Sequence, residues 1–205
     1  MKNKSSRPRG RPRTFDRDEV LDHAITTFLA KGYRGASLDD LTKSMGINRP
    51  SLYATFGNKQ RLFMEAIDRY AETFGSEPMK ALYGEEDIEN AIAAFFETKI
   101  RYFTLRGKPR GCLISNIATE AAENDGQVRD KLTGMFAENE KIIADRLRVA
   151  QDLGQLPKYS DPLAFARMIV SIALSIATRA RVGDSREELS RTVGDFMAVL
   201  FPKPT

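Results

Sequence analysis

Apolar residues recur every three or four positions along almost the whole chain from residue 16 onward, and the alternation typical of a strand is nowhere sustained. This pattern predicts helices, which glycine, proline and capping side chains divide into segments. We expect an all-α architecture of about nine helices, with a small N-terminal domain and a larger C-terminal bundle. The expected helices lie near residues 16–32, 37–45, 48–56, 58–70, 86–105, 113–123, 127–153, 160–182 and 185–201.

Several of these segments open with a residue whose side chain can cap a helix. Ser37 is followed three residues later by Asp40, and Ser185 by Glu188, which is the spacing of a capping box. Gly46 suits the left-handed conformation that ends a helix. The N-caps expected in the N-terminal part are Asp16, Ser37, Asn48 and Asn58.

Charge is distributed unevenly over the 205 residues. Residues 1–61 hold 13 Lys and Arg against six Asp and Glu, and six of those 13 cations lie in residues 1–15. The rest of the chain is mildly acidic. We call residues 1–61 the head and residues 62–205 the body. A basic head beside a mildly acidic body favours contact with nucleic acid through the head.

Cysteine and histidine counts exclude several classes of protein. A single cysteine, Cys112, forms no intramolecular disulfide or cysteine-rich zinc site, and His23 is the only histidine. No phosphate-binding glycine loop or nucleophile elbow is present, so we expect no cofactor, no metal and no enzyme activity. The N-terminus lacks the apolar run of a signal peptide, and the longest apolar stretch is too short to span a membrane. We therefore expect a cytoplasmic protein without a membrane partner.

Residues 37–56 form a helix-turn-helix pattern, in which two short helices follow a longer one and are joined by a glycine turn. In DNA-binding examples the second helix directs its first turn into the major groove. Arg49 can pair with guanine, Ser51 can hydrogen-bond a base or a phosphate, and the Pro50 ring can touch a thymine methyl group. The alternative is two helices joined by a glycine turn without DNA contact. Five polar residues are placed to meet phosphates at the rims: Ser37, Asn48, Tyr53, Thr55 and Lys59.

Two stretches, Gly32–Leu41 and Met45–Leu62, resemble the DNA-binding domain of TetR-family repressors. The resemblance implies that residues 49–51 read bases and that Tyr53 and Lys59 contact phosphates. Thr55 stands where the family often has histidine, so a hydroxyl would replace the imidazole contact.

The resemblance also implies a domain organisation and partners. Residues 16–65 would form the DNA-binding domain, and residues 66–205 a C-terminal domain for effector binding and dimerisation. Family members are usually homodimers that leave a palindromic operator when an effector binds. Here the effector would be an unknown small molecule or reactive compound.

Residues 1–15 are rich in positive charge and have almost nothing to bury, so we expect a disordered basic arm. The run Arg9-Gly10-Arg11-Pro12-Arg13 resembles an AT-hook, whose arginines lie in an A·T-rich minor groove. The alternative is a solvated tail that adds only salt-dependent affinity.

Cys112 is a candidate sensor of electrophiles or oxidants. It lies at an expected helix start and follows three cations, Arg106, Lys108 and Arg110, and both features favour the reactive thiolate. The segment resembles a TetR subset with Gly-Cys at the start of the sixth helix. The alternative is an inert, half-buried cysteine.

The last two helices would supply the dimer interface in this family. Their apolar stripes are the candidate contact, with burial inside the monomer as the alternative. The residues are Ile172, Ile176, Val193, Phe196, Met197 and Leu200.

The sequence is compatible with two functions. The first is a repressor released from a palindromic operator by a small-molecule, electrophile or oxidant signal. The second is an architectural protein that binds A·T-rich DNA without an effector.

Overall fold

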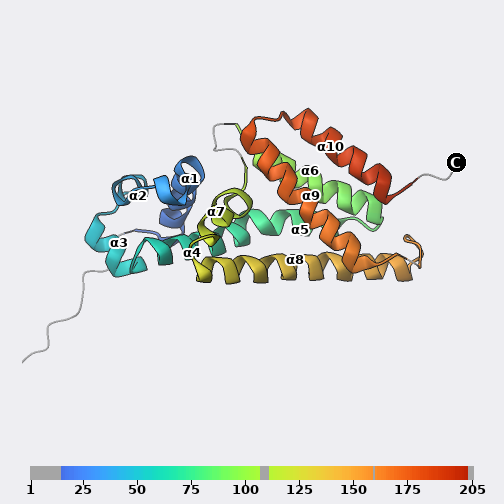
Figure 1. The fold of residues 1–205 in the computed structure, drawn as a ribbon, viewed down its shortest axis with the longest axis horizontal. Coiled ribbons are helices and arrows are strands. Elements are labelled where there is room, and N and C mark those ends of the chain that lie inside the picture. The colour runs from blue at the N-terminus through green and yellow to red at the C-terminus, as the bar shows by residue number, and fades with distance from the viewer. Residues whose placement is uncertain (1–14, 107–110, 159, 203–205) are drawn as a thin grey trace, which may run out of the picture.

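The computed structural model describes residues 15–106, 111–158 and 160–202, and these fold into helices joined by short turns (Figure 1). The predicted all-α class is confirmed. The helices are α1 (Arg17–Gly35), α2 (Leu38–Met45), α3 (Arg49–Phe56), α4 (Lys59–Tyr70), α5 (Ser76–Gly84), α6 (Ile88–Phe103), α7 (Thr119–Ala122), α8 (Gly126–Asp152), α9 (Pro162–Val182) and α10 (Arg186–Leu200). Two π-helical segments, η1 (Ala71–Gly75) and η2 (Leu113–Ala118), interrupt this series.

The head consists of α1, α2 and α3 with the start of α4, at the left of Figure 1. All four N-caps expected here are confirmed, and Ser37 and Asp40 form the reciprocal capping box. Gly46 ends α2 with a φ of 64°, a left-handed conformation that glycine adopts at little cost. Local capping therefore fixes where the two short helices begin and how the chain turns between them.

The sequence pattern missed α5. The chain passes from α4 through η1 into α5 without leaving helical backbone angles, although Gly75 and Pro78 lie in this stretch. Pro78 has no N–H to donate, and a wide π turn is an irregularity at which a helix tolerates such a loss. One long helical path consequently leads from the head into the body.

The body is a bundle in which α9 packs along α8 and also contacts α6 and α10. Phe95, Phe96, Ile143 and Leu147 are buried in its core. Among the described residues, α9 is the only helix long and apolar enough to cross a membrane, with a mean hydropathy of 1.5. Here it is a bundle helix, and its apolar character serves packing against other helices.

Polar contacts among the described residues link the head and α4 to the bundle. Gln60 Nε2 donates to Asp125 Oδ2 at 2.6 Å, and Lys131 Nζ lies 2.5 Å from Asp68 Oδ1, so both contacts tie α4 to the N-terminal part of α8. A hydrogen bond from Arg181 Nη1 of α9 to the Leu29 carbonyl of α1 measures 2.8 Å. These contacts can therefore transmit a movement of α8 or α9 directly to α4 and the head.

Candidate DNA-binding face and effector cavity

Helix α3 presents its first turn to solvent and keeps its opposite side in the core. Arg49 and Pro50 are exposed, whereas Leu52 and Phe56 are buried. Asn48 Oδ1 accepts the Ser51 backbone N–H at 2.8 Å and so caps the helix. Capping and core packing therefore hold the three predicted base-reading residues together on an exposed turn, the arrangement that major-groove reading requires.

Arg49 is held by a carboxylate that the sequence analysis did not single out. Its Nε and Nη2 donate to Asp39 Oδ1 at 3.1 and 2.8 Å. The Asp39 side chain is 77% exposed, so solvent screens the pair and its effect on stability is small. The carboxylate orients the guanidinium and places a negative charge beside the predicted base-reading turn. No local spacing could reveal it, since α2 and α3 meet only in the folded head.

We expect Asp39→Ala to reduce DNA specificity. The freed Arg49 can contact phosphates of any sequence, so affinity for unrelated DNA should rise and the ratio of operator to unrelated affinity should fall about tenfold. Fluorescence anisotropy with both duplexes measures this ratio. Asp145→Ala, on the remote helix α8, makes the same change in net charge and serves as the control. Equal ratios in the two variants would show that Asp39 acts through charge alone.

The residues predicted to contact phosphates lie around the base-reading turn but differ in exposure. Ser37, Asn48 and Tyr53 are exposed, and Thr55 is half-buried. Lys59 is also half-buried: its ammonium lies 4.9 Å from the centre of the Tyr33 ring, and burial lowers its pKa. The structure brings these residues together, and their contact with DNA stays a prediction. Arg9, Arg11 and Arg13 of the arm lie outside the described residues.

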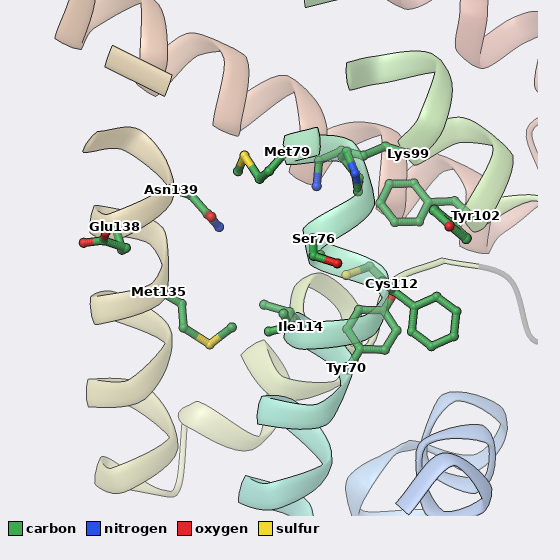
Figure 2. Close-up of a pocket in the computed structure, with 15 residues that line it drawn as sticks. Tyr70, Ser76, Met79, Lys99, Tyr102, Cys112, Ile114, Met135, Glu138 and Asn139 are labelled. Atoms are coloured by element: carbon green, nitrogen blue, oxygen red, sulfur yellow. The ribbon is translucent and has the colours of Figure 1, made fainter. Parts of the chain in front are cut away.

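A cavity of about 300 Å³ lies in the body where the path from α4 to α5 passes α6, η2 and α8 (Figure 2). Phe74, Met79, Tyr102 and Met135 give it a largely apolar wall. Both π-helical segments border it, and such segments often occur at functional sites. Its size is at the lower end of the range for small-molecule sites.

Cys112 and Tyr70 lie in this cavity wall, as Figure 2 shows. Cys112 occupies the N-cap position of η2, and its N–H donates to Asn116 Oδ1 at 2.8 Å. Burial raises the pKa of Tyr70 well above its usual value, and the adjacent Cys112 side chain raises it further. Tyr70 is the last residue of α4, so the thiol lies beside the helix that connects body to head.

The glycine before Cys112 has a structural reason. Gly111 has a φ of 90°, and a Cβ there would clash with Asn116 Oδ1, the acceptor of the Cys112 N–H. It would also lie 3.2 Å from the Ala177 carbonyl oxygen of α9. Gly-Cys is therefore a geometric unit in which glycine permits the turn that places the thiol at the cavity. Of the three cations expected near Cys112, Arg106 is exposed, and Lys108 and Arg110 lie outside the described residues.

Two family models match the parts of the chain that carry these features. Residues 20–66 match "Bacterial regulatory proteins, tetR family", and residues 89–196 match "Tetracyclin repressor-like, C-terminal domain". The chain belongs to the TetR family. With a helix-turn-helix head of this geometry, it is a DNA-binding transcriptional regulator.

Two TetR-family relatives match over nearly the full length of the chain. The HTH-type transcriptional repressor ComR of Escherichia coli (strain K12) is 34% identical over 187 residues, which cover 91% of this chain and 89% of ComR. A cysteine mutant of the regulator CifR, solved in complex with 26-bp double-strand operator DNA, is 32% identical with a TM-score of 0.87. That match covers 94% of this chain and 100% of the CifR chain.

The TetR-family C-terminal domain places most of the predicted dimer residues inside its own core. Of the six, Ile176, Val193, Phe196, Met197 and Leu200 are buried within one protomer, and Ile172 is half-buried. Phe196, for example, packs edge-on against Phe96 at 5.9 Å between ring centres. An amphipathic helix has one dominant apolar stripe, and here that stripe packs into the core of the protomer's own bundle. These five residues are buried within one protomer, as the alternative requires, and their part in the dimer interface stays a prediction.

The outward faces of α9 and α10 carry small side chains with exposed apolar residues beside them. Ser171 and Ser175 lie one turn apart on α9, as do Gly194 and Ala198 on α10, and all four are exposed. Val199 is 72% exposed. Small residues at this spacing allow two helices to approach closely, and the neighbouring apolar side chains would gain from being covered.

Proposed function

We propose that this protein is a homodimeric repressor that binds a pseudo-palindromic operator through two copies of α3 and leaves it when a signal reaches the cavity at Cys112. The single observation that carries the proposal is that α4 begins directly after the DNA-reading helix and ends, at Tyr70, in the cavity wall. The names of ComR, a repressor, and of CifR, complexed with operator DNA, support it. Such a protein acts where the DNA is, in the cytoplasm, and has no enzyme activity.

Operator release would follow from the way that α4 is held. Helix α8 supplies Met135 and Asn139 to the cavity wall opposite Tyr70, and its N-terminal part is tied to α4 through Asp125 and Lys131. A ligand that spreads the wall must move α8 relative to α4 or break these contacts. Because α4 is continuous with the head, that shift changes the separation of the two α3 helices in a dimer, and half-site spacing is a geometric requirement for binding.

The two remaining functions differ in what they require of the body. An architectural A·T-rich DNA binder needs no internal cavity, whereas a signal-responsive repressor needs one that is connected to the head. The cavity and its wall residue Tyr70 therefore favour the repressor. An experiment can distinguish the two functions most readily by testing whether DNA binding responds to a signal.

We expect Cys112 to carry the response to electrophiles. With wild-type protein on its operator, p-benzoquinone should lower affinity at least tenfold, because the adduct adds bulk in a cavity whose wall includes Tyr70 of α4. Cys112→Ser should keep its operator affinity under the same treatment. Anisotropy of a labelled operator duplex measures both. Since Cys112 is the only cysteine, a serine variant that responds equally would remove it as the sensor.

A further inference from the structure

Lys99 of α6 lies in the cavity wall, and no described carboxylate pairs with its ammonium group. Its ammonium lies 5.0 Å from the centre of the Phe95 ring and 5.9 Å from that of Phe103. Within the described part of the chain it makes no ion pair. Burial lowers the pKa of Lys99, and the nearby Cys112 side chain partly offsets this effect. Aromatic faces alone compensate poorly for the lost hydration of an ammonium group.

The polar groups that share the cavity with Lys99 include several that can donate hydrogen bonds. Asn139 points into the space from α8 in Figure 2, and the Tyr70 hydroxyl and Cys112 thiol lie on the facing wall. Glu138 is the only carboxylate among the lining residues, and Figure 2 shows it directed away from the cavity. A ligand that enters therefore meets a positive charge and amide and hydroxyl donors.

The space beside Lys99 continues toward α9. A smaller hollow of about 60 Å³ shares Lys99, Cys112 and Asn139 with the main cavity and extends to Val170 and Leu174. Lys99 thus stands where the two hollows meet, and apolar and aromatic side chains surround it on both sides. Such a site suits a compact ring system that carries one anionic group.

We propose that the cavity at Cys112 selects small anionic ligands in which a carboxylate pairs with Lys99 and an apolar ring fills the space between α5, α6 and α8. The inference deepens the proposed function, because it gives the chemical class of the effector. It further implies that an electrophile bearing a carboxylate reaches Cys112 in preference to a neutral one. No DNA is needed to test it, so it and the repressor function can fail separately.

Iodoacetate and iodoacetamide test the charge preference, since they differ mainly in charge. Each alkylates a thiolate by displacement: a bond forms between Cys112 Sγ and the methylene carbon, iodide leaves, and the thiol proton passes to solvent. Intact-mass spectrometry gives the two rates, and Cys112 is the only thiol. In folded wild-type protein, the ratio of the iodoacetate to the iodoacetamide rate should exceed that of the urea-unfolded chain at least about tenfold.

Lys99→Arg and Lys99→Met provide the matched controls. The arginine variant keeps the charge and should keep the raised ratio, whereas the methionine variant keeps the apolar stem and should lose it. A wild-type ratio equal to that of the unfolded chain overturns the proposal, and so does a raised ratio that survives in Lys99→Met. Absence of alkylation by either reagent would also overturn it, because the cavity would then admit no ligand. If Lys99→Met does not fold, a ratio that is not raised in folded wild-type protein still overturns the proposal.

A pair of reversible ligands tests the ring. 2-Naphthoate and 2-naphthamide have the same ring system, and only the first carries a charge. Naphthoate should protect Cys112 from iodoacetamide at a concentration at least about tenfold below that required for the amide. Equal protection by the two compounds would contradict the role of Lys99. If neither compound protected Cys112, the proposal that the ligand carries an apolar ring would be contradicted.

Discussion

Gly194→Arg converts the dimer to a folded monomer whose operator affinity is lower at least about 100-fold. The residue lies on the outward face of α10, and a Cβ there would meet no atom within 4 Å beyond its chain neighbours and the backbone of its own helix. The variant protomer should therefore fold normally, while the arginine blocks close approach of a second copy. Two linked heads bind a palindrome far more tightly than either alone, since the second contact is intramolecular. Sedimentation and operator anisotropy measure the two effects.

The control for this prediction is another exposed helical glycine. Gly134 lies on α8 and also has open space around a hypothetical Cβ. Gly134→Arg adds the same side chain and charge away from α9 and α10, so it should remain dimeric and bind operator as wild type does. A dimeric Gly194→Arg protein with unchanged affinity would show that the outward face of α10 is not the interface.

Phe63→Ala should destabilise the protein by about 3–5 kcal/mol, because it removes a fully buried ring and leaves a cavity. Phe63 of α4 packs against Phe28 at 4.8 Å and Tyr33 at 4.6 Å between ring centres, and so joins α4 to α1. Urea unfolding followed by circular dichroism, at one protein concentration, measures the loss. Operator binding should weaken as well, since the head loses its support.

Phe63→Leu is the matched control for the ring. It keeps an apolar side chain at the site and should cost less than about 1.5 kcal/mol. If Phe63→Ala also cost less than that, the aromatic cluster would not be what holds α4 against the head. Signal transfer through α4 would then lack its mechanical basis.

Features set by short-range chemistry could be predicted from the sequence. Ser37 caps α2 and Gly46 ends it through contacts within a few residues, so composition and spacing sufficed. The same holds for the exposed turn at Arg49, because the residues that hold it on α3 lie beside it in sequence.

Features that depend on contacts between distant segments were missed. Asp39 meets Arg49 only when α2 packs on α3, and Lys99 and Cys112 line one cavity only in the assembled bundle. For α10, a sequence shows that one face is apolar but not which helix covers it. Phe196 lies against Phe96 of the same protomer, a contact that no local pattern encodes.

Footprinting of the protein on the DNA upstream of its own and neighbouring genes tests whether two α3 helices read a palindromic operator. A dimer that reads bases through two α3 helices should protect one short pseudo-palindrome whose half-sites lie about one helical turn apart. Arg49→Ala should abolish this protection while weak, salt-dependent binding persists. The contrary result is diffuse protection of A·T-rich segments, without a palindrome and unchanged in Arg49→Ala. It would contradict base reading by two α3 helices and identify an architectural DNA-binding protein.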